Sequence, residues 1–466
     1  MLRLLEFGSP ALERFLESLV RDRADNATAV DATVTKIVEQ VRRGGDDALQ
    51  KLSWRLDRIK LQPNRIRVTP PEIRSALETL SSGERRALEL AARRIADFHR
   101  RTLERPFSYR DALGMRLGQL VRPLRRVGIY VPGGTGAYPS SVLMNAIPAR
   151  VAGVHEIVMV SPVTETGDRP GVLAAAAIAG ISEVYRVGGA HAIAALAYGT
   201  ESIAPVDKIV GPGNAYVQAA KRMVYGTVDI DKMAGPSEVL VIADEHAKPE
   251  WLAADLIAQA EHGSGDECAI LLTPSRPLAN RVSAAVEEAL SDLPRAASVR
   301  VALQKRGAAV VVPGLNQAFQ LANRIAPEHL QLDISGANQW LPEISAAGAV
   351  FVGPMSPSPL GDYIAGPNHV LPTGGSARFA SPLGAYDFLK RTSIIVGSRA
   401  AVQKLGPEVA RLARMEGFEG HARAIELRLR PRAATNTKGN TAPDLASKPI
   451  ANKNGRPQKS RRHYVN

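Results

Sequence analysis

Over the first 110 residues, hydrophobic and polar positions follow a helical period. Apolar residues recur every three or four positions among many charged ones in residues 33–52 and 71–103, which predicts two amphipathic helices. Gly44 and Gly45 interrupt the first of these stretches and predict a break in it. The chain therefore begins with a region that we expect to be helical.

From about residue 127 the pattern changes to short runs rich in β-branched residues that alternate with Ala-rich stretches of helical period. This alternation is typical of parallel sheets covered by helices. The first block predicts strands at 126–131, 156–160, 183–187, 208–210, 239–243 and 268–272, and helices at 142–151, 172–179 and 191–198. The second predicts helices at 249–262, 280–290 and 315–326 and strands at 307–312, 330–334 and 349–352, followed by a Gly/Pro-rich stretch at 353–375 and a helix at 400–429.

Composition places the chain among ordinary globular proteins. It has 466 residues, of which 45% are hydrophobic and 23% charged, so it can bury a large core. The single cysteine, Cys268, excludes an internal disulfide framework and a cysteine-based zinc ribbon, and indicates a reducing compartment. The longest uncharged apolar run, residues 171–181, is too short for a membrane helix. We expect a soluble, cytoplasmic protein without a membrane partner.

The net charge of +13 first suggests a nucleic-acid partner, but its location changes that interpretation. Residues 432–466 hold eight Lys or Arg against one acid, which is about half of the excess. This segment has almost no large apolar residue, so we predict a disordered basic tail. Any contact with nucleic acid would be confined to it.

Two glycine-rich turns are candidates for a phosphate or dinucleotide site. Residues 132–139 follow a predicted strand and precede a helix, but Pro139 stands where a G-x-G-x-x-G motif needs its third glycine. The turn Gly211–Asn214 has the same position after the strand at 208–210. On the glycine pattern alone, a plain tight turn is favoured at both places. A P-loop is excluded, because the sequence contains no Gly-Lys pair.

Several acids, amides and histidines gather in polar turns. Gln259 and His262 are three residues apart near a predicted helix end, where they can share a face and bind one divalent metal. A histidine in a last helical turn is also simply favoured by the helix dipole. Glu328 and His329 form a candidate acid/base pair, or an exposed polar loop. Further candidates are Asp362, His369, Glu416 and His421, whereas His99, His155, His246 and His463 are interpreted as surface residues.

At these residues the sequence resembles the histidinol dehydrogenases. The motifs that carry the resemblance occur in family order and cover residues 1–430. They are RVGIYVPGGTGAYPSSVLMNAIPA (126–149), VGGAHAIAALAYGT (187–200), KIVGPGNAYV (208–217), AGPSEVLVIAD (234–244), AQAEHGSGDE (258–267), APEHLQL (326–332), GDYIAGPNHVLPTGGSARF (361–379), DFLKRTS (387–393) and EGFEGHARA (416–424).

The resemblance implies a zinc-dependent enzyme that oxidises L-histidinol through L-histidinaldehyde to L-histidine and reduces two NAD, in the last steps of histidine biosynthesis. It implies Glu328 and His329 as the catalytic acid/base pair. Gln259, His262, Asp362 and His421 match the Zn²⁺ ligands. Tyr130, His191 and Asn214 match cofactor contacts. The implied substrate-binding residues are Ser237, Gln259, His262, His329, Asp362, His369, Glu416 and His421.

The implied fold is α/β, with two incomplete Rossmann-like lobes, small helical segments at both ends and an intertwined homodimer with shared active sites. We assign a helical N-terminal segment to 1–30, a first α/β domain with the metal and acid/base residues to 31–129 and 239–380, and a second, NAD-binding domain to 130–238. Residues 381–431 would be an arm that reaches the partner subunit, and 432–466 the disordered basic tail.

The sequence departs from the family pattern at three places. His191 stands where the family usually has Gln, Lys232 where it more often has an apolar residue, and the tail has no family counterpart. The first two keep open a paralogue that oxidises another amino- or sulfo-alcohol. A basic binding protein without catalysis is a third hypothesis, which the presence of the full acid/base and metal set disfavours.

Overall fold

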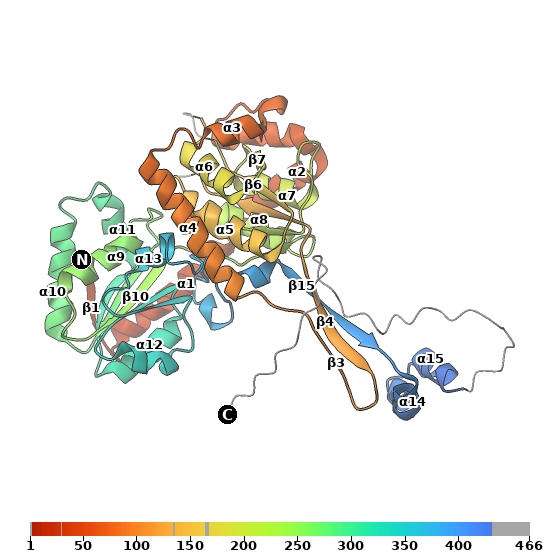
Figure 1. Ribbon diagram of the computed structural model, residues 1–466. Helices are drawn as coiled ribbons and strands as arrows, with labels where there is room; N and C mark the ends of the chain where they lie inside the picture. Colours follow the sequence, from red (N-terminus) through yellow and green to blue (C-terminus); the bar gives the residue numbers. More distant parts are fainter. Residues whose placement is uncertain (1, 29, 134–135, 164–166, 431–466) are drawn as a thin grey trace. The chain divides into compact units, whose positions relative to one another are not determined.

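The computed structural model describes residues 2–28, 30–133, 136–163 and 167–430 (Figure 1). The predicted tail at 432–466, with His463, lies outside them. The described residues form two compact units: one holds residues up to Pro106 with Leu120–Thr392, and the other holds Phe107–Gln119 with residues 393–430. The first unit contains two six-stranded sheets, so the predicted mixed α/β fold with parallel sheets is confirmed.

One sheet is parallel throughout. Its strand order is β1 (Arg3–Glu6), β12 (Gly307–Val311), β11 (Cys268–Thr273), β10 (Glu238–Ala243), β13 (His329–Asp333) and β14 (Ala349–Val352). The central strands are apolar at nearly every position because helices cover both faces. One face packs on α9 (Pro249–Ala260), α10 (Arg276–Ala289) and α11 (Ala296–Arg306), and the other on α1 (Pro10–Thr28) and α12 (Leu315–Ile325).

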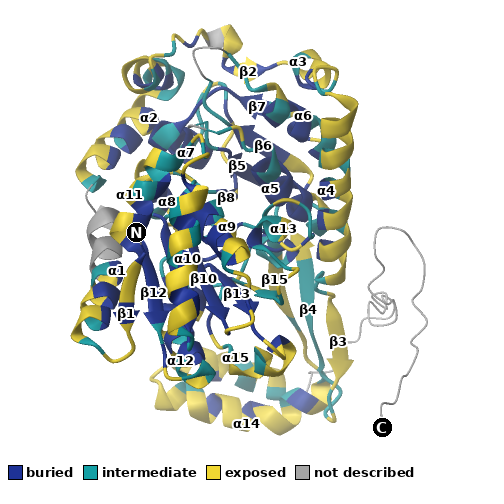
Figure 2. Ribbon diagram, turned by 90° about the vertical axis from the view of Figure 1, so that its left-hand side faces the viewer, coloured by how far each residue is buried: buried dark blue, intermediate teal, exposed yellow. Residues whose placement is uncertain are grey.

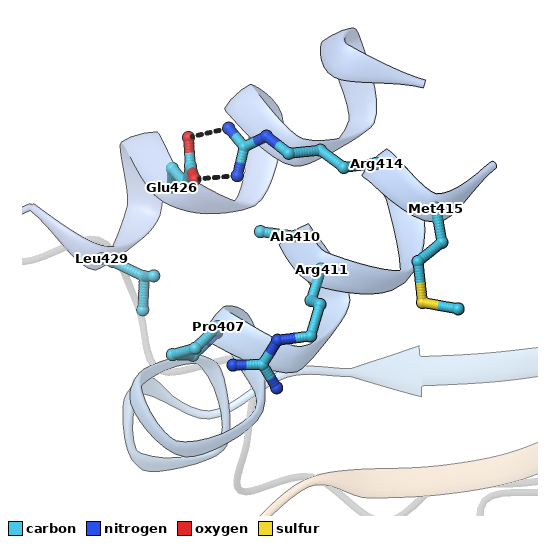
Figure 3. A pocket seen from close by; sticks show the side chains of 7 residues that line it. All are labelled: Pro407, Ala410, Arg411, Arg414, Met415, Glu426 and Leu429. Carbon is cyan, nitrogen blue, oxygen red and sulfur yellow. Dashed lines mark hydrogen bonds and ion pairs between the residues drawn. The ribbon is translucent and has the colours of Figure 1, made fainter. Parts of the chain in front are cut away.

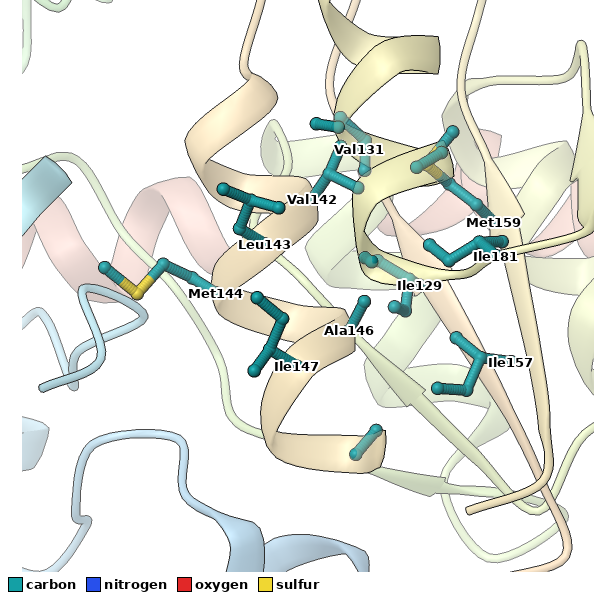
Figure 4. Packing of buried hydrophobic residues seen from close by; sticks show 14 of the residues in the cluster. Ile129, Val131, Val142, Leu143, Met144, Ala146, Ile147, Ile157, Met159 and Ile181 are labelled. Atoms are coloured by element: carbon teal, nitrogen blue, oxygen red, sulfur yellow. The ribbon is translucent and has the colours of Figure 1, made fainter. Parts of the chain in front are cut away.

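The other sheet has one antiparallel edge, where β2 (Arg67–Val68) pairs with β7 (Glu183–Tyr185). The parallel strands β6 (Glu156–Val160), β5 (Arg126–Tyr130), β8 (Lys208–Val210) and β9 (Asp229–Ile230) follow. On one face lie α3 (Pro70–Ser75), α4 (Ser82–Arg101), α5 (Pro139–Ala152) and α6 (Pro170–Ala179) (Figure 4). On the other lie α2 (Asp31–Leu52), α7 (Gly189–Tyr198) and α8 (Ala215–Val224). Figure 2 shows the central strands of both sheets buried.

The structure corrects the grouping of residues 31–129 with 239–380. Residues 31–129 supply β2, most of β5 and helices α2–α4 to the sheet that is otherwise formed by residues 130–238, and not to the sheet formed by residues 239–380. The reason is that the apolar side of α2, with Val34, Ile37 and Val41, packs against α7 rather than against the sheet of β10. An amphipathic pattern says that a helix covers a sheet, but not which sheet.

Two of the helical stretches predicted from the sequence, 71–103 and 33–52, are interrupted in the structure. The stretch 71–103 is interrupted at 76–81, where Ser81 begins α4 by accepting the Glu84 backbone N–H while the Glu84 carboxylate accepts from Ser81. The predicted break in α2 is confirmed, since Gly45 has a φ of 49° and a Cβ atom there would collide with the Glu201 carboxylate. The irregular stretch 353–375 contains the short helix α13 (Ser358–Tyr363).

The second unit consists of a hairpin and two helices that the chain forms after β15 (Leu389–Val396). The hairpin joins β3 (Phe107–Arg110) to β4 (Arg116–Pro123), and the strand order is β15-β4-β3. The predicted helix 400–429 is divided into α14 (Arg399–Met415) and α15 (Glu419–Leu429). A hollow between these helices is lined by Pro407, Ala410, Arg411, Arg414, Met415, Glu426 and Leu429, and Arg414 pairs with Glu426 across it (Figure 3). Among the described helices, none combines the length and apolarity needed to cross a bilayer.

Candidate active site

Glu328 and His329 lie at the amino end of β13, between strands β10 and β14 of the first sheet. Helix α12 ends at Ala326, which adopts the left-handed conformation with a φ of 51° and turns the chain sharply into the strand. Both side chains are buried, 6% exposed for Glu328 and 3% for His329. A buried carboxylate beside a buried imidazole is the kind of pair that acid/base chemistry uses, and an exposed polar loop is excluded.

Glu238, the first residue of the neighbouring strand β10, orients both members of the pair. Its backbone N–H donates to Glu328 Oε2 at 2.8 Å, and its carbonyl accepts from His329 Nδ1 at 3.0 Å. On the other side of the ring, His329 Nε2 lies 3.2 Å from Asp362 Oδ1. Burial lowers the pKa of His329, but the charges of Glu328 and Asp362 outweigh it and raise the pKa to about 10.

Gln259 and Asp362 meet beside His329. Gln259 Nε2 donates to Ser358 Oγ at 3.1 Å and to Asp362 Oδ2 at 3.4 Å. Gln259 Oε1 is buried and has no hydrogen-bond partner among the described residues. Burial raises the pKa of Asp362, but the cationic forms of His329, His369 and His262 lower it below its usual value. A buried acceptor without a donor is costly, so this oxygen fits a site that receives a cation.

Three of the four predicted metal ligands, Gln259, His262 and Asp362, belong to the first unit, where Gln259 is hydrogen-bonded to Asp362 and His262 lies close enough to lower the pKa of Asp362. His262 Nδ1 lies 2.9 Å from the Gln259 carbonyl oxygen. Over the part of the chain that is described, no three His, Cys, Asp or Glu side chains are grouped closely enough to hold a metal ion. The fourth predicted ligand, His421, belongs to the second unit, as does Glu416.

His369 connects this cluster to the other sheet. Its Nδ1 lies 2.7 Å from the Asp362 carbonyl oxygen, and its Nε2 lies 3.4 Å from Ser141 Oγ on α5. Burial lowers the pKa of His369. Ser237 directly precedes β10, and its carbonyl accepts the Cys268 N–H at 3.0 Å. Sequence reasoning missed Ser141 and Glu238; the one signal for Glu238 is a charge at the start of an otherwise apolar strand.

The site lies between the amino end of one sheet and the carboxyl end of the other. Glu238 and His329 begin strands of the β10 sheet, whereas Ser141 follows β5 and the Gly211–Asn214 turn follows β8. Open α/β sheets usually bind ligands beyond the carboxyl ends of their strands. Here the sheet that contains β5 and β8 supplies those carboxyl ends. The acid/base pair can therefore precede a strand and still face a ligand.

The predicted cofactor residues lie at this carboxyl edge. Tyr130 ends β5; its hydroxyl accepts the Gly189 N–H at 3.1 Å, and burial raises its pKa to about 12. Asn214 caps α8 by accepting the Val217 N–H at 3.1 Å. His191 is fully buried on α7, and its Nε2 lies 3.3 Å from both Ser53 Oγ and Asp57 Oδ2. Its Nδ1 has no partner within the described ranges.

One interpretation of the remaining histidines was wrong. His155 and His246 are exposed, as expected, but His99 is only 1% exposed. It sits in the last turn of α4, on the side that faces the core. The spacing of Ala91, Ile95 and His99 places this histidine on the apolar side of the helix, a signal that the interpretation from the sequence did not use.

Comparison with known proteins gives one consistent result. The family model for histidinol dehydrogenase matches residues 20–429. A histidinol dehydrogenase of Syntrophotalea carbinolica is 50% identical over 432 residues, which cover 92% of this chain and all of the relative. That of Rhizobium meliloti is 49% identical, with 91% and 98% covered. The crystal structure of histidinol dehydrogenase from Elizabethkingia anophelis superposes with a TM-score of 0.85 at 34% identity, covering 92% of this chain and 98% of that one.

Proposed function

Because the chain belongs to the histidinol dehydrogenase family and is an NAD-dependent dehydrogenase, we propose that it oxidises L-histidinol through L-histidinaldehyde to L-histidine with reduction of two NAD. The observation that carries this proposal is the buried cluster of Glu328, His329 and Asp362, which lies between the strand ends of the two sheets.

In the first oxidation, His329 accepts the hydroxyl proton at Nε2 while the carbinol carbon gives up its hydride to NAD. The two carboxylates around His329 stabilise the imidazolium that results, which favours proton uptake by the ring. With both charges unopposed, the pKa of about 10 keeps the ring protonated at neutral pH. A cation held by Asp362 would offset one of these charges, which would lower that pKa and favour the neutral ring that can act as a base.

In the second oxidation, Glu328 removes a proton from the water that attacks the aldehyde carbon. The hydrate that forms then gives up a second hydride to a second NAD and releases its two hydroxyl protons to solvent, which leaves the carboxylate of L-histidine. The Glu238 N–H holds one oxygen of Glu328 in place for this step. Two oxidations with different proton acceptors explain why a carboxylate and an imidazole stand side by side.

We assign the zinc ligands to Gln259, His262, Asp362 and His421. The unsatisfied Gln259 Oε1 and the lowered pKa of Asp362 support this, as does the N/O character of the set. When bound, zinc supplies a positive charge that orients the substrate and polarises its reacting group. Ser237, His369 and Glu416 complete the substrate contacts, with Glu416 facing a cationic amine.

We assign the cofactor contacts to Tyr130, His191 and Asn214. Asn214 begins α8, where free helix N–H groups and the helix dipole favour a phosphate. Asp57 and Ser53 lie against Nε2 of His191, so Nδ1 is the ring atom left for the cofactor. The enzyme acts as a homodimer in which the arm, with Glu416 and His421, completes the partner's site.

The test is NADH formation with L-histidinol, followed at 340 nm before and after chelation and after zinc is added back. We expect turnover that chelation abolishes and zinc restores, together with a fall in melting temperature on chelation that zinc reverses. Turnover confined to another amino- or sulfo-alcohol would favour a paralogue, to which the departures at His191 and Lys232 point. No turnover with any alcohol would contradict the proposal.

A further inference from the structure

A short segment, residues 231–238, runs from β9 to β10 and touches both halves of the site. The Ala234 N–H donates to Gln218 Oε1 on α8 at 3.0 Å. The Gly235 N–H donates to Thr373 Oγ1, and Glu238 Oε1 accepts the Gly374 N–H at 3.2 Å. The segment therefore joins the cofactor edge of one sheet to the loop that follows His369.

Asp231 binds the backbone of the Gly211–Asn214 turn through its carboxylate. Its Oδ2 accepts the Gly211 N–H at 2.8 Å, and its Oδ1 pairs with Lys221 Nζ, which also donates to the Gly211 carbonyl at 3.0 Å. Both polar backbone groups of Gly211 are thus fixed. The side chains of Lys221 and Asp231 are 0% and 1% exposed, so solvent screens this pair little. A Cβ atom on Gly211 would collide with the Tyr130 carbonyl, which shows how closely the turn approaches a proposed cofactor residue.

Lys232 contacts the loop that follows His369, on the proposed substrate side of the site. Its Nζ donates to the carbonyls of Val370 at 3.2 Å and Ser381 at 2.8 Å. Val370 directly follows His369, and its carbonyl also accepts the Leu383 N–H at 2.9 Å. One ammonium group therefore fastens the two ends of the loop 370–381 beside a proposed substrate contact.

The charges around Lys232 support this role. Burial, opposed by the charges of Asp231 and Asp387 and assisted by those of Lys221 and Lys208, lowers the pKa of Lys232 to about 8. The cation is therefore the main form at pH 7, and its bonds to neutral carbonyls are charge-assisted. An apolar side chain at this position, as the family more often has, cannot make them.

We propose that Asp231 and Lys232 are positioning residues for the two ligands: Asp231 fixes the turn that receives NAD, and Lys232 fixes the backbone beside His369 that receives L-histidinol. This assignment rests on the proposed function. Neither side chain touches the reacting atoms, so each acts through the segment that it holds.

The experiment separates the two KM values. In Lys232→Met, which keeps the length and the apolar stem, we expect the KM for L-histidinol to rise about tenfold while the KM for NAD stays within about twofold. In the double variant Asp231→Asn/Lys221→Gln, which removes both charges together, we expect the KM for NAD to rise while the KM for L-histidinol stays within about twofold. Lys232→Arg keeps a cationic donor and should recover part of the histidinol KM. Lys36→Met, an exposed lysine on α2, is the matched control.

A merely structural role would lower the melting temperature or kcat and leave both KM values alone. That outcome, or equal rises of both KM values in Lys232→Met, would overturn the assignment. Hydrogen–deuterium exchange on the unliganded protein tests it without turnover. In Lys232→Met, amides of 368–383 should exchange faster and those of 211–217 should not; unchanged exchange at 368–383 would also overturn it. A wild-type enzyme inert toward L-histidinol would instead contradict the proposed function.

Discussion

At the scale of single residues, His99 combines burial with two unsatisfied ring nitrogens. Neither Nδ1 nor Nε2 has a partner in the described structure, and the ring meets Phe98 edge-on at 5.3 Å between centroids. Burial lowers the pKa of His99 to about 4. The neutral ring is tolerated in the core, whereas its protonated form is not.

The lowered pKa makes the stability sensitive to acid. The unfolded chain binds the proton near pH 6.5 and the folded chain only near pH 4, so this residue costs stability as the pH falls through that window. We expect His99→Leu to lose less stability than the wild type between pH 8 and pH 5, by about 2 kcal/mol. Urea unfolding at both pH values measures this, with the exposed His155→Leu as control. Parallel losses in wild type and His99→Leu would rule the effect out.

Residue identity singled out the candidate site residues in the sequence but not the residues that orient them. Gln259, Glu328, His329, Asp362 and His369 could be singled out from the sequence, because each is a polar residue close to a Gly or Pro. Glu238, Ser141 and Ser358 orient them from elements that are distant in the chain. Such partners have no local signal, because each is an ordinary polar residue until the fold brings it to a ligand.

At the scale of elements, the hydrophobic period and the positions of Gly and Pro predicted element bounds well where strands and helices are long or fully buried. The strands at 156–160 and 208–210 begin and end as predicted, and the Gly45 break was anticipated. The strand β1 was missed because its sequence RLLE has no alternation and its partner, β12, lies about 300 residues away. Edge pairing over such a separation depends on the whole sheet.

The assignment of helices to sheets required the structure. In α7, Ala190, Ala192, Ala194, Ala195 and Ala197 present a small-residue surface, on which the apolar side of α2 packs closely. This complementarity decides that residues 31–52 cover the sheet of β5. Hydrophobic period describes one face of one element and carries no information about the shape of its partner.

At the scale of the whole molecule, the amino ends of strands in the β10 sheet lie near the carboxyl ends of strands in the β5 sheet. The carboxyl edge of the β5 sheet offers helix starts and turns suited to a cofactor, and the amino edge of the β10 sheet offers buried acid/base residues. Glu416 and His421 lie in the second unit, on exposed segments of α14 and α15. A site that needs them is completed only when an arm is in place.

Hybrid dimers test whether the arm comes from a second copy. Glu328→Gln and His421→Ala chains should each be inactive as homodimers, because each removes a group from every site. Mixed after mild dissociation, they should regain about a quarter of wild-type activity, since half of the dimers are hybrids and each hybrid has one intact site. Activity after mixing is the measurement, with unmixed homodimers carried through the same treatment as control. No recovery in verified hybrids would count against shared sites.

The most direct measurement is the stoichiometry of the complete reaction. A limiting amount of L-histidinol is incubated with excess NAD and the wild-type enzyme, and NADH and L-histidine are both quantified at completion. If Glu328 and His329 serve two successive oxidations, two NADH and one L-histidine form for each L-histidinol consumed. One NADH with accumulation of L-histidinaldehyde, or no L-histidine at all, would contradict the assignment.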